Sequence, residues 1–174
     1  MAVNEHHRHG AHAHLKLAVI TASDTRDAAS DESGRLIREL LEGADHRVMH
    51  YEVLPDTPER IAEAVRKGVR EFDGVIINGG TGIAARDSTI EAIRPLIDKE
   101  LEGFGELFRA LSYQEIGSAA FLSRALAGIS EGKIIVALPG SPNACRLAME
   151  KLILPELGHM AHLLGLASTH DHQH

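Results

Sequence analysis

The chain has 174 residues, of which 44% are apolar and 25% are charged, a composition that suits one globular domain with a hydrophobic core. A formal net charge of −7 and an aromatic content of 3% argue against a broad nucleic-acid-binding surface, although a local pocket can still attract a small anion. No segment has the roughly 20 consecutive apolar residues of a membrane helix, and no secretory signal precedes the first apolar run. We therefore expect a cytoplasmic protein that contacts neither nucleic acid nor membrane.

Histidine-rich segments lie at both ends of the sequence. Residues 6–14 read HHRHGAHAH and residues 170–174 read HDHQH, and neither segment has hydrophobic periodicity. We interpret residues 1–14 and 167–174 as disordered tails that flank one domain at 15–166. The alternative interpretation is transition-metal capture by neighbouring imidazoles, which would make the chain a metal-handling protein.

Strand and helix patterns alternate along the first half of the domain. A β-like apolar run at 15–20 is followed by a polar turn and by a helix with apolar residues at helical spacing: Leu36, Ile37, Leu40 and Leu41. Residues 48–54 predict a second strand. Thr57 followed by Pro58 is typical of the start of the next helix.

The second half continues this alternation. Residues 74–78 form a short, almost fully apolar run, as expected of a parallel strand buried on both faces. A helix containing Ile90, Ile93 and Ile97 follows, and residues 101–126 predict a helical pair. Residues 133–138 are the last clear strand, before a long final helix that Pro155 kinks or splits. The alternation predicts a single-domain α/β fold: a doubly wound, mainly parallel sheet with helices on both faces.

Four segments with polar or glycine residues follow predicted strands. They are residues 21–26, 55–57, 79–82 and 139–143. The carboxyl ends of parallel strands meet at one edge of a sheet, and open α/β sheets bind their ligands there. We therefore expect the four segments to converge on one site.

The segment Gly79-Gly80-Thr81-Gly82 suits a phosphate-binding loop. Three glycines allow positive φ angles and close approach to a ligand, exposed N–H groups can bind phosphate oxygens, and the threonine adds a hydroxyl. The loop is neither a Walker A motif nor the GxGxxG motif of dinucleotide-binding folds. A tight strand-to-helix connection without a ligand is the alternative.

Two aspartates occupy neighbouring candidate loops. Asp56 and Asp87 could hold Mg²⁺ beside a phosphate, an arrangement that would suit phosphoryl or nucleotidyl transfer. Alternatively, Asp56 is a turn residue and Asp87 caps a helix. Ser141 is open to the same two interpretations, because a helix entrance can bind an anion or merely be capped.

The sequence shows no evident nucleophile. Cys145 is the only cysteine, so no internal disulfide can form, which fits a reducing cytosol. We interpret Cys145 as a packing residue. Ser112, Ser123 and Ser141 have no histidine nearby in sequence, so covalent serine catalysis is not indicated.

Six stretches of the chain share their order and spacing with one known family: residues 18–24, 55–56, 79–82 with 86–87, 103–112, 122–125 and 138–144. Together they resemble the MoaB and Mog family of molybdopterin-binding proteins. The resemblance covers about residues 15–165, and residues 112–117 are most similar to the MoaB branch.

The resemblance implies a ligand and a reaction. Catalytic relatives bind molybdopterin and adenylylate its phosphate with Mg-ATP, releasing pyrophosphate. By analogy, residues 79–82 would cradle phosphate or nucleotide, and Asp56 and Asp87 would be the catalytic and Mg²⁺-binding residues. The other predicted ligand-binding residues are Thr21, Ser23, Asp24, Ser112, Ser123, Gly140, Ser141, Pro142 and Asn143.

The resemblance also implies a homo-oligomer, either a trimer or a dimer of trimers (a hexamer), and contacts with other molybdenum cofactor biosynthesis proteins. Members of the MoaB branch differ in catalytic competence. Asp56 and Asp87 are both present, which permits activity. The alternative function is a non-catalytic molybdopterin-binding or carrier protein of the same pathway.

Overall fold

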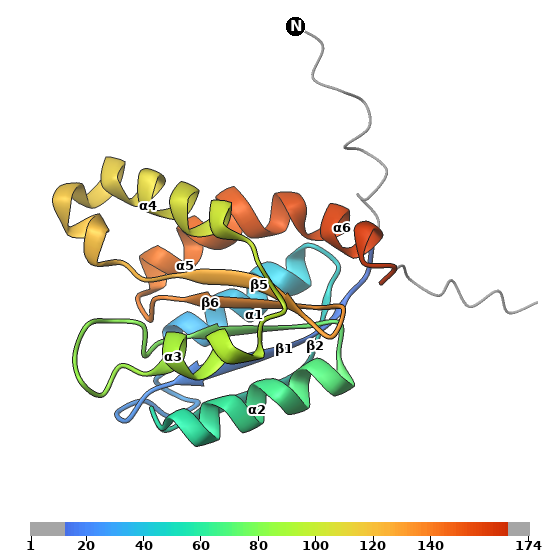
Figure 1. Cartoon of the computed structure of the whole chain (residues 1–174), viewed down its shortest axis with the longest axis horizontal. Helices are drawn as coiled ribbons and strands as arrows, with labels where there is room; N and C mark the ends of the chain where they lie inside the picture. Colours follow the sequence, from blue (N-terminus) through green and yellow to red (C-terminus); the bar gives the residue numbers. More distant parts are fainter. Residues whose placement is uncertain (1–12, 167–174) are drawn as a thin grey trace, which may run out of the picture.

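The computed structural model describes residues 13–166, which form a six-stranded sheet in the order β2-β1-β3-β6-β5-β4 (Figure 1). The strands are β1 (Lys16–Ala22), β2 (Arg47–Leu54), β3 (Gly74–Asn78), β4 (Lys99–Glu100), β5 (Leu126–Ser130) and β6 (Lys133–Leu138). Strands β2, β1, β3 and β6 are parallel, whereas β5 is antiparallel to β6 and β4 is antiparallel to β5.

Helices cover both faces of this sheet. They are α1 (Glu32–Gly43), α2 (Pro58–Glu71), α3 (Thr89–Ile93), α4 (Glu102–Ile116), α5 (Pro142–Ala148) and α6 (Leu154–Leu163). Helices α2 and α3 pack on one face, and α1, α4, α5 and α6 pack on the other (Figure 1). The predicted single-domain α/β fold, with a mostly parallel sheet and helices on both faces, is confirmed. None of the helices between residues 13 and 166 combines the length and apolar content of a bilayer span.

Helix starts follow their local sequence signals. Asp31 caps α1, where its carboxylate accepts the Gly34 N–H at 3.0 Å, and Pro58 occupies the first turn of α2 after Thr57. The final helix is interrupted close to Pro155, as predicted. A π-helical turn, η4 (Met149–Ile153), separates α5 from α6, since a proline ring and its missing N–H disturb the preceding turn.

The prediction of a helical pair at 101–126 was wrong in part. Only α4 is an α-helix; a 3₁₀ helix, η3 (Gly117–Leu122), follows it, and Leu126 begins strand β5. The sequence pattern did not indicate strands β4 and β5. Strand β4 has only two residues, which carry no periodicity, and the short apolar run of β5 does not distinguish a strand from a helix. Ile97 also lies outside its predicted helix, in extended backbone after the 3₁₀ helix η2 (Arg94–Leu96).

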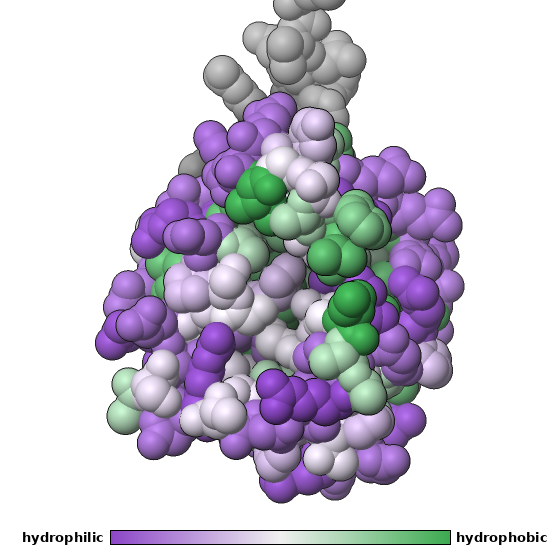
Figure 2. Space-filling model, turned by 90° about the vertical axis from the view of Figure 1, so that its left-hand side faces the viewer, coloured by the Kyte–Doolittle hydropathy of each residue, from purple (hydrophilic) through white to green (hydrophobic). Residues whose placement is uncertain are grey.

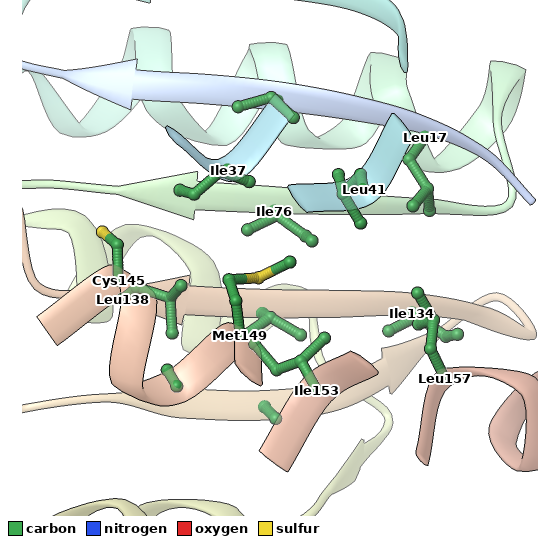
Figure 3. Packing of buried hydrophobic residues seen from close by; sticks show 14 of the residues in the cluster. Leu17, Ile37, Leu41, Ile76, Ile134, Leu138, Cys145, Met149, Ile153 and Leu157 are labelled. Carbon is green, nitrogen blue, oxygen red and sulfur yellow. The ribbon is translucent and has the colours of Figure 1, made fainter. Parts of the chain in front are cut away.

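The core consists of two apolar layers separated by the sheet. In β3, Ile76 joins the layer beneath α1 and α5 (Figure 3), and Ile77 joins the layer beneath α2 on the other face of the sheet. All five residues of β3 are buried, as predicted for a strand covered on both faces. The first layer also includes Ala13, so the packed body begins within the predicted N-terminal tail. Residues 1–12 and 167–174 of the two predicted tails lie outside the described residues.

Cys145 lies in the first of these layers (Figure 3). It is fully buried, its thiol donates to the Pro139 carbonyl at 3.1 Å, and burial raises its pKa to about 12. We expect an aromatic disulfide reagent to leave the native protein unmodified at pH 8 and to modify one thiol after unfolding in guanidinium. A Cys145→Ala variant should give no signal in either state, and rapid modification of native protein would contradict the assignment as a packing residue.

Candidate functional site

A cleft of about 380 Å³ lies at the carboxyl ends of the parallel strands. Figure 2 faces this edge of the molecule and shows it hollowed, with surrounding surface that is mostly hydrophilic. Segments that follow β1, β2, β3 and β6 all contribute to the lining, which confirms that the four candidate segments converge. The lining residues are Ala22–Arg26, Asp56, Gly79–Gly82, Arg86, Asp87, Leu122–Arg124, Pro139 and Gly140.

Gly79 and Gly80 form a sharp turn at the end of β3. Their φ angles are 88° and 65°, in the left-handed region that favours glycine. The Gly79 N–H donates to the Leu138 carbonyl at 3.0 Å, and the Thr89 hydroxyl donates to the Gly79 carbonyl at 2.8 Å. The backbone N–H groups of Gly80, Thr81 and Gly82 have no acceptor among the described residues. The loop can therefore donate hydrogen bonds to an anion in the cleft.

Asp56 projects from the segment after β2 and joins three loops. One of its oxygens accepts the Ser88 hydroxyl at 3.0 Å, and its own N–H donates to the Asp24 carboxylate at 3.0 Å. Burial raises the pKa of Asp56, and the negative charges of Asp87 and Asp24 raise it further. Within residues 13–166, no nearby positive charge outweighs these effects on the ionised carboxylate, and a cation bound in the cleft would stabilise it.

Asp87 also lies beside the glycine loop and lines the same cleft. A Cβ added to Gly80 would lie 2.7 Å from Asp56 Oδ2, and one added to Gly82 would lie 2.6 Å from Asp87 Oδ2. The two carboxylates therefore lie beside different glycines of the same loop. The capping interpretation of Asp87 was wrong, because the N-cap of α3 is Ser88 and the Asp87 carboxylate accepts the Ala84 N–H at 3.0 Å.

Three arginines that sequence reasoning did not single out also line the cleft. Arg26 approaches Asp31 at 3.9 Å, and Arg86 is exposed beside Asp87. Arg124 lies just before β5 and donates to the carbonyls of Thr81 and Gly82. Arg86 and Arg124 fall within the stretches that resemble the known family, and this resemblance was the only sequence feature that pointed to them. Arg26 and Arg86 place positive charge beside the cleft aspartates, so a small anion can bind here despite the negative net charge of the chain.

The predicted ligand-binding residues divide into two groups. Those in the cleft lining are Ser23, Asp24, Gly79, Gly80, Thr81, Gly82, Ser123 and Gly140. The cleft lining does not include Thr21, Ser112, Ser141, Pro142 or Asn143.

The residues of the second group have other positions. Thr21 is buried behind the cleft, where its hydroxyl donates to Asp31 at 2.6 Å and accepts from Asn78 at 2.8 Å. Ser112 is buried on α4. Ser141 caps α5 by accepting the Ala144 N–H at 3.2 Å, so the capping interpretation of Ser141 is confirmed.

Among the described residues, the cleft offers carboxylate oxygens but no larger set of metal ligands. Across residues 13–166, histidine, cysteine, aspartate and glutamate side chains nowhere gather in a group of three or more that could hold one. Asp56 and Asp87 offer two carboxylates beside a loop suited to phosphate. This donor set fits Mg²⁺, which is commonly held by one or two carboxylates with substrate phosphates and water completing its shell.

Comparison with known proteins agrees with this geometry. A family model described as "Probable molybdopterin binding domain" matches residues 18–159. The chain belongs to this family. A similar protein, molybdenum cofactor biosynthesis protein B of Halalkalibacterium halodurans, is 50% identical over 159 residues, which cover 90% of this chain and 94% of the relative. The resemblance to the molybdopterin-binding family is thus confirmed.

Solved structures extend the comparison to the fold. A crystal structure of molybdenum cofactor biosynthesis protein B has 51% sequence identity and a TM-score of 0.86, covering 88% of this chain and 97% of the other. The tungsten cofactor synthesizing protein MoaB from Pyrococcus furiosus has 41% identity and a TM-score of 0.80, covering 87% and 97%. The molybdopterin-binding fold therefore extends over nearly all of the described residues.

Proposed function

We propose that this chain acts in molybdenum cofactor biosynthesis, in the cytoplasm, by binding molybdopterin and adenylylating its phosphate with Mg-ATP. The observation that carries the proposal is the pairing of a glycine loop with two flanking carboxylates in one cleft. Family membership favours molybdopterin as the ligand. The free N–H groups of the loop suit a phosphate, and the two aspartates suit a cation that accompanies a nucleotide.

The proposed reaction exchanges one phosphoanhydride bond for another. An oxygen of the molybdopterin phosphate forms a bond to the α-phosphorus of ATP. The bond between that phosphorus and the oxygen that bridges the α- and β-phosphates breaks, and pyrophosphate leaves with this oxygen. The attacking phosphate is already anionic at neutral pH, so no general base is required. The work of the protein is to align the two phosphates and offset their charge.

In this scheme each group in the cleft has a separate task. Asp56 and Asp87 would hold Mg²⁺, which when bound offsets negative charge on the nucleotide phosphates. The N–H groups of residues 80–82 would orient a phosphate, and Arg26 and Arg86 would add positive charge at the edge of the cleft.

The decisive experiment incubates the purified chain with molybdopterin, ATP and Mg²⁺ and measures adenylylated product and pyrophosphate. Both products should form in equal amounts, and chelation of Mg²⁺ should stop the reaction. A preparation that binds molybdopterin but releases no pyrophosphate, under conditions in which a catalytic relative turns over, would overturn the enzymatic proposal. If that binding also survived Asp56→Asn and Asp87→Asn, the carrier function would be supported instead.

We also propose that the chain self-associates as a trimer or hexamer. Large apolar side chains are exposed on α4 and η3: Leu107, Tyr113, Ile116, Phe121 and Leu122. Such side chains gain free energy when a partner covers them. Light scattering coupled to gel filtration should give a mass of three or six protomers, and a monomer at micromolar concentration would contradict this.

A further inference from the structure

Arg124 binds the backbone of the glycine loop. Its Nε donates to the Thr81 carbonyl at 2.8 Å, and its Nη2 donates to the Gly82 carbonyl at 2.7 Å. The contacts join segments more than 40 residues apart in sequence. A planar guanidinium holds two neighbouring acceptors in a fixed relative orientation, which a lysine ammonium cannot do.

Glu91, on α3, neutralises the charge of this arginine. The Arg124 guanidinium pairs with the Glu91 carboxylate through both terminal nitrogens, and this bond holds the pKa of Glu91 below its usual value. The side chain of Arg124 is 31% exposed, and that of Glu91 is 58% exposed. With its donors divided between two carbonyls and a carboxylate, Arg124 has little capacity left for a ligand.

The carbonyl contacts fix one end of the loop, including the Gly82 N–H donor. Within a planar peptide unit the C=O and N–H groups point in opposite directions, so fixing one fixes the other. By holding the carbonyls of Thr81 and Gly82, Arg124 fixes the N–H groups of Gly82 and Ile83. The left-handed turn at residues 79–80 fixes the other end of the loop.

We propose that Arg124, supported by Glu91, is a positioning residue that sets the conformation of the phosphate-binding loop and does not itself serve as a phosphate ligand. The inference rests on the proposed function for the meaning of the loop, but the loop conformation can be measured without any ligand. Two properties then follow. A positive charge at position 124 is not sufficient to hold the loop in its phosphate-binding conformation. Removing the Glu91 carboxylate does not improve phosphate binding.

The test compares Arg124→Lys, Arg124→Gln and Glu91→Gln in the full chain. Arg146→Lys is the matched control, because Arg146 pairs with Glu150 on the surface at 2.8 Å, outside the cleft. Backbone amide shifts and hydrogen exchange of residues 80–83 are measured by NMR without ligand. Titration with Mg-ATP is then followed by calorimetry, and thermal melting monitors folding.

Both Arg124 variants should shift the amide signals of Gly82 and Ile83, speed their exchange and weaken Mg-ATP binding by about tenfold, as expected for the loss of hydrogen bonds to the loop. Glu91→Gln should give a smaller change in the same direction. The control should match wild type.

Three results would overturn the proposal. Full Mg-ATP affinity in Arg124→Lys would show that charge alone suffices, and tighter binding in Glu91→Gln would show that the arginine is a ligand. Unchanged amide signals in both Arg124 variants would show that the loop keeps its shape unaided. If wild type itself bound no Mg-ATP, the adenylylation proposal would fail, while the ligand-free amide signals would still decide the role of Arg124.

Discussion

Replacing Asp56 or Asp87 with asparagine should lower kcat for adenylyl transfer by about a hundredfold or more, equivalent to about 2.7 kcal/mol of transition-state stabilisation. The amide keeps the size of the side chain and one acceptor oxygen. It can therefore still accept the Ser88 hydroxyl at position 56 and the Ala84 N–H at position 87. What it loses is the negative charge that would hold Mg²⁺. Rates at saturating molybdopterin and ATP, measured over a range of Mg²⁺ concentrations, check this expectation.

Asp56→Asn should not lower the melting temperature. The pKa of Asp56 is raised in the folded protein, so stability falls as pH rises through its titration, and at neutral pH the ionised group costs folding free energy. A neutral amide removes that cost. A variant that is at least as stable but inactive would indicate that the charge is kept for function.

Asp98→Asn provides a control matched to Asp87→Asn. Asp98 also accepts a single backbone N–H, from Glu131 at 2.8 Å, but it lies near the turn between β5 and β6, at the opposite edge of the sheet from the cleft. Its replacement should leave the rate unchanged. Equal loss of activity in Asp98→Asn and Asp87→Asn would refute a specific role for the cleft carboxylates.

Gly79→Ala should destabilise the fold by about 1–3 kcal/mol from backbone strain, with a further cost from a steric clash. Gly79 has a φ of 88°, and an added Cβ would overlap the carbonyl oxygen of Ala22. That oxygen belongs to the backbone of β1 and cannot rotate away. Denaturant unfolding, with the slope held in common between variants, measures the change.

Gly43→Ala is the matched glycine control. Gly43 ends α1, its φ is not positive, and an added Cβ would meet nothing within 4 Å. The same substitution there should change stability by less than about 1 kcal/mol, and should stabilise if anything. Similar losses at both positions would mean that the turn after β3 is not a constrained element of the cleft.

The residues of the glycine loop and its two aspartates could be predicted because each follows a recognisable strand. Once β1, β2, β3 and β6 are parallel, their carboxyl ends must share an edge, and the attached loops must meet there. The proximity of Asp56 to Gly80 follows from this topology, whereas Asp87 lies near Gly82 because both belong to the segment between β3 and α3. Thr21 was predicted in the turn after the first strand, but it lies within β1, and its hydroxyl bonds to Asp31 and Asn78 in a buried network.

The position of Arg124 could not be predicted in the same way. It precedes β5, which the sequence pattern did not distinguish from the end of a helical region. Because β5 runs antiparallel to β6, its amino end lies at the edge where the parallel strands end. The residues before β5 are thereby brought into the cleft. The sequence prediction considered only segments that follow strands, so it did not include Arg124.

By itself, the sequence determined several local features of this protein: the alternation of the parallel strands with helices, the starts of α2 and α5, and the glycine turn. These depend on side-chain size, hydrophobic spacing and backbone freedom within a few residues. Only the tertiary structure decided which side chains face the cleft, how Arg124 reaches the glycine loop and why the pKa of Asp56 is raised. Such properties arise from burial and from charges brought together by distant segments, which no local pattern encodes.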